Sequence, residues 1–395
     1  MKGWEIKKLS QLFDVKSSRR VHQADWKSSG IPFYRAREVV KLAKDGIVEN
    51  ELFISEELYE QFTKEKGAPK TGDIIVSAVG TLGQCYLVKD SDKFYFKDAS
   101  VLWFENSGKV NSRYIEYAFK ADSILAQVMD GSMGATVGTL TISRAKDIEI
   151  PLPPLPEQQR IVAILDEAFA TIAKAKTNAE QNLKNAKELF ESYLQGVFEN
   201  KVDGWEEKTL GEVCEYDKNS NKRDDLPYVG LEDIQSNTGI FIGPFEPRSM
   251  KSLTFYFNND HVLYGRLRPY LNKVLLPDFE GHCSTEIFPI KPKKSVLDRG
   301  FLFRWLIAAE TMKKINATWT GATLPRANMN AVLDFKINIP PLKEQNKIVQ
   351  KLDALSAETK KLEAIYLQKI NDLEELKKSI LQKAFSGELN LNAVI

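Results

Sequence analysis

The sequence predicts an α+β fold, in which two β-rich globular domains in a pseudo-two-fold arrangement are separated by two long antiparallel α-helices that form a coiled coil. The main observation is a repeated phrase, Pro-Pro-Leu-x-Glu-Gln, which occurs at residues 153–158 and again at residues 340–345. The copies are 187 residues apart, and a long helical pattern follows each of them. The chain is therefore a tandem duplication whose period is a whole domain.

The two halves agree best where the helices begin and differ most in their globular parts. Isolated matches, such as Gly134-Ala135-Thr136 with Gly321-Ala322-Thr323, still keep the frame of the repeat. This contrast predicts one scaffold that carries two different specificities. The expected segments are a first globular domain at 1–150, a first helix at 151–200, a second globular domain at 201–338 and a second helix at 339–395.

Both globular parts contain short apolar runs bounded by turn-forming residues, such as Ile31–Tyr34 in the first part and His261–Tyr264 in the second. Runs of this length that are rich in aromatic and β-branched side chains favour strands. One helix is expected to interrupt each domain. These helices begin after Asn111 and Asp298, which stand at equivalent places and have the side chains that N-caps require.

The long helices follow from the repeated phrase and from the spacing of apolar residues behind it. Prolines keep the backbone extended, and a glutamate then falls in the first helical turn, where the helix dipole favours negative charge. Apolar residues recur at alternating steps of four and three, which is the pattern of a coiled coil. Asn182 and Lys369 would act as polar register marks. The predicted seams are Ile161, Leu165, Ala168, Ile172, Ala175, Ala179, Asn182, Ala186, Leu189 and Tyr193 in the first helix, and Ile348, Leu352, Leu355, Thr359, Leu362, Tyr366, Lys369, Leu373, Leu376 and Ile380 in the second.

Composition excludes several classes of protein. No stretch reaches the roughly 20 apolar residues of a membrane span, and the first residues lack the apolar centre of a signal peptide, so we expect a cytoplasmic protein without a membrane partner. Cys85, Cys214 and Cys283 are widely separated, which predicts buried thiols and not disulfides. Zinc bound by Cys214, Cys283 and nearby histidines is the alternative, but the spacing fits no standard tetrahedral site, and no metal is expected.

The duplication also suggests what such a chain binds. Two similar domains on antiparallel helices match a DNA target with two separated half-sites, whose spacing the protein's own dimensions fix. The formal net charge is only +1, whereas a free-standing DNA-binding domain usually has a basic excess. The basic residues must therefore be clustered, or a partner must share the contacts with phosphate.

The order of motifs resembles the specificity (S, HsdS) subunit of type I restriction-modification systems. The resemblance rests on the Gly-Trp starts at residues 3 and 204, the Gly-Ala-Thr loops, the repeated phrase followed by Ile-Val, and the ending Leu381–Leu389, and it covers essentially the whole chain. It implies a bacterial or archaeal protein with two target recognition domains that read the two parts of a bipartite DNA sequence. It also implies two methylation subunits, which carry S-adenosylmethionine, and restriction subunits, which use ATP and Mg²⁺. By this resemblance the chain itself holds no cofactor and is not a catalyst.

The residues separately give no sign of catalysis. The sequence lacks the glycine-rich loop and lysine of a phosphate-binding site. The segment closest to an adenine methyltransferase motif is Asp225-Leu226-Pro227-Tyr228, but its counterpart in the first half, Gly30-Ile31-Pro32-Phe33, has no carboxylate or amide. Strand entry explains both segments better.

Candidate DNA contacts are polar residues on loops at equivalent places in the two halves. Arg, Asn and Gln suit base edges, while Lys, Ser and Thr suit phosphates. The candidates are Arg35, Arg37, Thr81, Gln84, Ser132 and Thr136 in the first domain, and Arg266, Arg268, Asn272, Lys273, Thr320, Thr323 and Arg326 in the second. Two other hypotheses stay open: a non-catalytic scaffold that assembles proteins without reading DNA, and an autonomous enzyme that would need a catalytic cluster.

Overall fold

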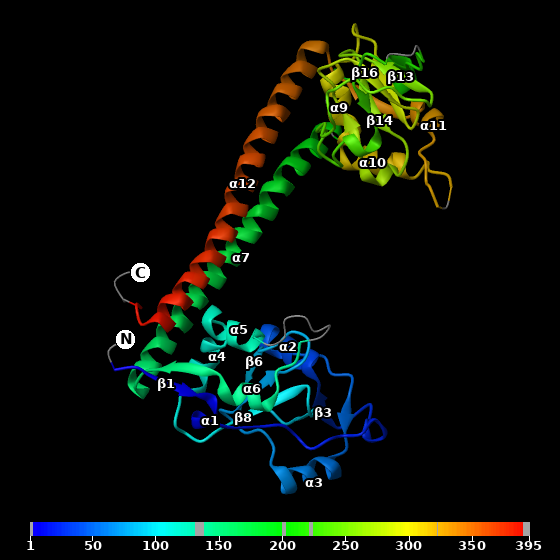
Figure 1. Cartoon of the computed structure of the whole chain (residues 1–395). Coiled ribbons are helices and arrows are strands. Elements are labelled where there is room, and N and C mark those ends of the chain that lie inside the picture. Colours follow the sequence, from blue (N-terminus) through cyan, green and yellow to red (C-terminus); the bar gives the residue numbers. More distant parts are fainter. Residues whose placement is uncertain (1–2, 131–137, 200–202, 221–223, 322, 390–395) are drawn as a thin grey trace. The chain divides into compact units, whose positions relative to one another are not determined.

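The computed structural model describes residues 3–130, 138–199, 203–220, 224–321 and 323–389 (Figure 1). The chain divides into two compact units. Unit 1 contains Met1–Asn178 and Lys369–Ile395, and unit 2 contains Ala179–Gln368. Each unit holds one globular domain and part of both long helices. Among the described helices, none has the length and hydropathy needed to cross a bilayer.

The core of unit 1 is a four-stranded antiparallel sheet in the order β2-β8-β5-β6. A smaller sheet has the order β4-β3-β7, and β1 pairs with β9. The strands are β1 (Glu5–Lys8), β2 (Phe13–Lys16), β3 (Ile31–Tyr34), β4 (Phe53–Ile54), β5 (Ile74–Ser77), β6 (Cys85–Leu87), β7 (Tyr95–Phe96), β8 (Val101–Asn106) and β9 (Glu149–Leu152). The helices are α1 (Leu9–Leu12), α2 (Ala36–Asp45), α3 (Glu56–Lys66), α4 (Ser112–Ala118), α5 (Asp122–Met129) and α6 (Ile142–Asp147), with a 3-10 turn η1 (Gln23–Asp25).

Unit 2 repeats this plan. Its four-stranded antiparallel sheet has the order β11-β17-β14-β15, its three-stranded sheet the order β12-β16-β13, and β10 pairs with β18. The strands are β10 (Glu206–Thr209), β11 (Cys214–Tyr216), β12 (Tyr228–Val229), β13 (Thr254–Phe257), β14 (Val262–Gly265), β15 (Val274–Leu275), β16 (Gly281–Ser284), β17 (Ile287–Pro292) and β18 (Lys336–Ile339). The helices are α8 (Leu210–Val213), α9 (Arg299–Ile307), α10 (Ala309–Asn316) and α11 (Met329–Leu333), with 3-10 turns η2 (Leu231–Asp233) and η3 (Pro269–Leu271).

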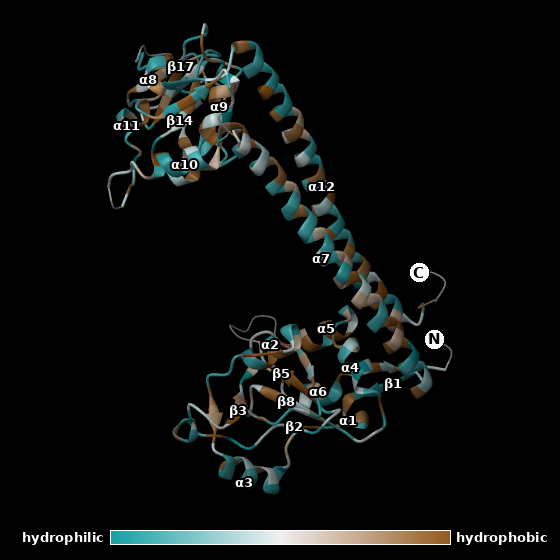
Figure 2. Cartoon of the chain, turned by 180° about the vertical axis from the view of Figure 1, so that it is seen from behind, coloured by the Kyte–Doolittle hydropathy of each residue, from teal (hydrophilic) through white to brown (hydrophobic). Residues whose placement is uncertain are grey.

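Each unit has its own large sheet of the same kind, but the small sheets of the two units differ. In both, the small sheet contains a parallel pair, β3 with β7 and β12 with β16. The third strand differs, because β4 pairs with β3 in unit 1 whereas β13 pairs with β16 in unit 2. Hydrophobic residues fill strands such as β5 and β8 (Figure 2), and every residue of β5 is buried. The prediction of two β-rich domains on one scaffold is confirmed.

The segment predicted as one helix inside each domain forms two helices, α4 and α5 in unit 1 and α9 and α10 in unit 2. The N-caps are confirmed: Asn111 accepts hydrogen bonds from two backbone N–H groups of α4, and Asp298 accepts one from α9. The prediction of one continuous helix was wrong, because Ala121 and Ala308 have extended backbones that separate α4 from α5 and α9 from α10. In unit 1 the break places Ile124 of α5 in the same core as α4.

The long helices are α7 (Leu155–Glu199) and α12 (Leu342–Ser386), each of 45 residues. In unit 1 the start of α7, with Ile161 and Leu165, shares a core with Ala384 and Phe385 at the end of α12. In unit 2, Leu194 near the end of α7 clusters with Leu352 near the start of α12. The helices are therefore antiparallel, as predicted.

Burial confirms only part of the predicted seams. The fully buried seam positions are Ile161, Leu165, Ile172, Ala179, Ala186, Leu352, Thr359 and Ile380. Asn182 and Lys369 are exposed, so the proposed register marks were wrong, and Leu189, Leu362 and Leu376 are exposed as well. A straight α-helix drifts by about 20° per heptad relative to a strict seven-residue repeat. Moreover, the helix ends pack into the cores of the globular domains, so the contact face is not a single unbroken seam.

The repeated phrase joins each domain to its long helix through a buried glutamine. Gln158 donates to the carbonyl of Pro153 at 2.8 Å and accepts from the backbone N–H of Asn111 at 2.9 Å. Gln345 makes the same two bonds, to Pro340 and from Asp298, both at 2.8 Å, and a third to the carbonyl of Val296. The glutamine therefore ties the first turn of the long helix to the N-cap of α4 or α9.

Candidate nucleic-acid interface

Two loops of unit 2, distant in sequence, form one surface beside the large sheet. The first connects β14 to β15 and the second precedes α11. The backbone N–H of Arg268 donates to the carbonyl of Pro325 at 2.7 Å, and that of Ala327 donates to the carbonyl of Arg266 at 2.9 Å. Leu267 also forms a β-bridge with Arg326. The structure thus brings together five of the predicted residues: Arg266, Arg268, Thr320, Thr323 and Arg326.

Arg268 is the most available cation of this surface. Its backbone is left-handed (φ 51°), and Pro269 fixes the start of the following turn η3. The side chain is exposed and has no partner among the residues that the structure describes. Thr320 exchanges two backbone hydrogen bonds with Arg326, each 3.0 Å, and Thr323 is exposed at the tip between them. Exposed Arg and Thr side chains are of the types that contact phosphate in protein–DNA complexes.

One carboxylate holds the other two arginines. Glu286 precedes β17; Arg266 Nε donates to its Oε2 at 2.9 Å, and Arg326 Nε donates to its Oε1 at 3.0 Å. Partial burial acts to raise the pKa of Glu286, but the hydrogen bonds from Arg326 and Arg266 outweigh it and hold the pKa below its ordinary value. Glu286 therefore stays ionised, and the three side chains carry a net charge of one.

Asn272 and Lys273 are engaged inside the domain. Asn272 is 4% exposed and donates from Nδ2 to the carbonyl of Ile307 at 3.1 Å. Lys273 donates from Nζ to the carbonyl of Leu231 at 2.5 Å. In this conformation Asn272 supports the loop and presents no side chain to a base.

The sequence reasoning missed two exposed aromatic residues in the same loops. Tyr270 and Trp319 are 46% and 49% exposed, and their rings meet edge to face with centroids 6.3 Å apart. Leu324, also on the second loop, is 45% exposed. Large aromatic residues beside Arg, Pro and Gly in both loops would have been a usable signal, because exposed apolar side chains that gather in one patch often mark an interaction site.

Unit 1 has the same pair of loops with different side chains. Val79 bridges Thr139, and the N–H of Leu140 donates to the carbonyl of Ala78 at 2.9 Å, as Ala327 does to Arg266. Thr81 is exposed in the turn between β5 and β6, and Gln84 is half-buried. Ser132 and Thr136 fall outside the described residues.

Arg35 and Arg37 lie at the start of α2 and are held by carboxylates. Arg35 donates from Nη2 to Oε1 of Glu38 at 2.9 Å, and Arg37 pairs with both Glu38 and Glu51. The side chain of Glu38 is 4% exposed. Burial acts to raise its pKa, but the two arginines outweigh burial and hold it below the ordinary value. Arg37, at 54% exposure, remains the more accessible of the pair.

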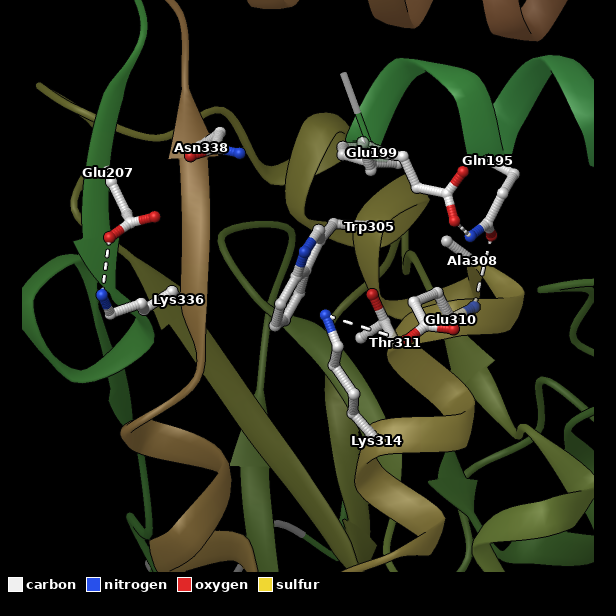
Figure 3. Close-up of a pocket in the computed structure, with 11 residues that line it drawn as sticks. Gln195, Glu199, Glu207, Trp305, Ala308, Glu310, Thr311, Lys314, Lys336 and Asn338 are labelled. Carbon is white, nitrogen blue, oxygen red and sulfur yellow. Dashed lines mark hydrogen bonds and ion pairs between the residues drawn. The ribbon is translucent and has the colours of Figure 1, made fainter. Parts of the chain in front are cut away.

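A cavity of about 410 Å³ in unit 2 lies beside the end of α7, and none of its lining residues belongs to these two loops (Figure 3). Its lysines already have acidic partners: Lys336 donates to Glu207 at 2.7 Å, and Lys314 lies 4.0 Å from Glu310. The three cysteines are free and buried, as predicted. Within the described residues, no three His, Cys, Asp or Glu side chains are grouped to hold a metal ion.

Comparison with known proteins gives consistent matches over the whole chain. A sequence profile of the type I restriction modification DNA specificity domain matches residues 1–184 and 202–374. The type I restriction enzyme EcoDI specificity subunit of Escherichia coli is 24% identical over 67% of this chain and 68% of that protein. The MjaIX specificity subunit of Methanocaldococcus jannaschii is 23% identical over 99% of this chain and 94% of its own length.

Solved structures show the same fold. The HsdS subunit from Thermoanaerobacter tengcongensis has a TM-score of 0.63 at 20% identity, covering 98% of both chains. A chain solved in work on complex assembly and conformational transition of the type I R-M system has a TM-score of 0.77 at 20% identity, covering 98% of this chain and 99% of its own.

Proposed function

Since this chain belongs to the family of type I restriction-modification DNA specificity domains, we propose that it reads a bipartite DNA target, one half-site for each globular domain. The observation that best supports this proposal is the pair of loops that recurs beside the large sheet of each unit. Their backbone hydrogen bonds match, while their side chains are Thr and Gln in unit 1 and Arg, Tyr and Trp in unit 2. A constant scaffold with variable loops suits two different DNA sequences.

In this proposal the recognition domains span 1–150 and 201–338, and the spacer helices span 151–200 and 339–395. DNA contacts come from Thr81 and Gln84 in the first domain and from the paired loops in the second. Ser132, Thr136, Arg35, Arg37 and Lys273 remain candidates, with Arg35 and Lys273 requiring their present partners to be displaced.

The chain acts without catalysis of its own, in the cytoplasm of a bacterium or archaeon. Two methylation subunits supply S-adenosylmethionine and modify adenine, and restriction subunits supply the ATP- and Mg²⁺-dependent cleavage. Shared contacts with these subunits also account for a net charge near zero, because the partners carry part of the phosphate binding.

The test is methylation of random-sequence DNA by this chain together with its methylation subunit. We expect modified adenines within one defined bipartite sequence. Stable assembly with the methylation subunit but no preferred sequence would leave the scaffold hypothesis in place of recognition. Turnover by the isolated chain would instead indicate an enzyme.

Exchange of residues 1–150 for the corresponding domain of a relative should change one half of the recognised sequence and leave the other half intact. Changes in both halves would contradict the division into two recognition domains. The adenines methylated in the host genome would identify both half-sites directly.

We further propose that the helices set the spacing between half-sites. Four residues inserted into α7 near Lys176 and four into the facing part of α12 would lengthen the helix pair by about 6 Å, at 1.5 Å per residue. That length is close to two base pairs at 3.4 Å each. The gap should grow while both half-site sequences stay the same, and an unchanged gap would refute this role.

A further inference from the structure

The cluster of Arg266, Glu286 and Arg326 leaves its two arginines in different states. Arg326 uses both Nε and Nη2 to bind Glu286, at 3.0 Å and 2.9 Å from Oε1. Arg266 uses Nε alone, at 2.9 Å from Oε2. Its Nη1 and Nη2 have no hydrogen-bond partner among the described residues, and its guanidinium lies 5.5 Å from the ring centroid of Phe288. Arg266 is therefore held through Nε, while the donors on Nη1 and Nη2 are free.

A guanidinium that is held through Nε and has Nη1 and Nη2 free can donate two hydrogen bonds to a DNA base. Two parallel N–H donors match O6 and N7 of guanine in the major groove, the commonest base-specific contact of arginine. A long flexible side chain loses rotamer entropy when it makes such a contact. Because Glu286 already fixes Arg266, less of that entropy remains to be lost on binding.

The equivalent positions in unit 1 show that this cluster belongs to the variable part of the scaffold. In unit 2 the N–H of Arg266 donates to the carbonyl of Glu286 at 2.9 Å, and in unit 1 the N–H of Ala78 donates to the carbonyl of Ser100 at the same distance. Thr139 takes the place of Arg326 in the bridge. The backbone frame is shared, while Arg, Glu and Arg are replaced by Ala, Ser and Thr.

We propose that Glu286 is a positioning residue for DNA reading by the second domain, which holds Arg266 so that its free Nη1 and Nη2 donate to a guanine of that half-site. Arg326 completes the cluster and offsets the charge of Glu286, while its Nη1 donates to the backbone carbonyl of Leu324 at 3.5 Å. The inference rests on the function proposed above and adds the base that one half-site must contain.

The test measures which sequences are methylated when variants of the full chain are assembled with the methylation subunit. Exchange of residues 1–150 first assigns the half-site of the second domain. Arg266→Gln should then accept other bases at one guanine of that half-site, with discrimination reduced roughly tenfold to a hundredfold. Glu286→Ala should relax the same position, and Glu286→Gln, which keeps one acceptor and the side-chain volume, should relax it less.

Matched controls separate positioning from folding. Glu207→Gln also removes an acidic partner in unit 2, from Lys336, but lies on β10 and should leave the recognised sequence unchanged. Arg266→Gln leaves Glu286 paired with Arg326, so it tests the reading without removing the carboxylate. The proposal is overturned if the second half-site contains no guanine, or if the variants lower methylation without relaxing any position. Absence of any preferred sequence with the unmodified chain would instead overturn the proposed function.

Discussion

Replacement of Gln345 by alanine should destabilise unit 2 more than the small number of side-chain atoms removed suggests. The side chain is 0% exposed and makes three hydrogen bonds, to the carbonyls of Pro340 and Val296 and from the N–H of Asp298, all of 2.8 Å. Alanine removes the side-chain partner of these three backbone groups, of which the carbonyl of Pro340 belongs to a buried residue. At about 1 kcal/mol for each lost bond, and more where water cannot reach the site, the loss is about 3 to 5 kcal/mol.

The assay is thermal unfolding followed by circular dichroism or calorimetry. For a cooperative unit the size of residues 179–368, each kcal/mol lowers the midpoint by about 2 to 4 °C, so the expected shift is roughly 6 to 20 °C. Asn346→Ala is the matched control, since it removes a similar amide that is exposed one residue later. Gln158→Ala, which loses two such bonds, should destabilise unit 1 to a smaller extent. Equal midpoints for Gln345→Ala and Asn346→Ala would refute the reasoning.

Four further predictions concern charge, thiols and the exposed loops. The pKa of Glu38 is lower in the folded chain than the unfolded value of about 4.3. Its contribution to the free energy of unfolding is therefore complete above about pH 4.3 and is lost as the pH falls through the folded pKa. Glu38→Gln should make the free energy of unfolding depend less on pH in this acid range. Burial raises the pKa of Cys214 to about 12 and also raises those of the other two cysteines, so a thiol reagent at pH 8 should label the native chain only as fast as it unfolds. Trp319→Ala should weaken DNA binding of the assembled complex about threefold to tenfold without changing stability. Arg268→Ala should reduce the salt dependence of binding by about one phosphate contact.

Three of these predictions have a control or a result that would contradict them. Acid unfolding of Glu38→Gln is compared with that of Glu60→Gln, which changes an exposed carboxylate on α3, and equal curves would contradict the burial argument. Rapid labelling of a cysteine in the folded chain would contradict its burial. Ile47→Ala removes an apolar side chain of unit 1 that is more exposed than Trp319, at 78% against 49%, and should leave DNA affinity unchanged. A loss equal to that of Trp319→Ala would mean a nonspecific surface effect.

Sequence periodicity predicted the long helices and the β-rich domains because both depend on local spacing of apolar residues. The same reasoning failed where packing decides. Asn182 and Lys369 fitted a heptad frame, yet both are exposed, since helix drift and the docking of domain cores select other positions. Likewise, no local signal marked the breaks at Ala121 and Ala308, whose extended backbones let two short helices share one core.

For the candidate interface, the sequence predicted that the candidate residues lie on loops at equivalent places in the two halves, but it did not predict the state of their side chains. The matching positions of Arg266, Arg268 and Arg326 with loops in the first half followed from the repeat alone. Only the folded structure shows that Asn272 is buried and that Glu286 binds two arginines from different loops. The two arginines are 20 and 40 positions from Glu286 in sequence, and they meet it through the strand order β17-β14-β15 and the bridge at Leu267.

The sequence by itself determined that the chain is a duplicated scaffold, where its two long helices begin and which family it resembles, because a repeated phrase and its periodicity are one-dimensional properties. The tertiary structure decided why that phrase recurs and which cations remain free. Gln158 and Gln345 occur in both copies, and each accepts a hydrogen bond from the backbone N–H of a helix N-cap 47 residues earlier in the chain. Arg268 is free and Arg326 is held because only folding determines which carboxylates come within hydrogen-bonding distance.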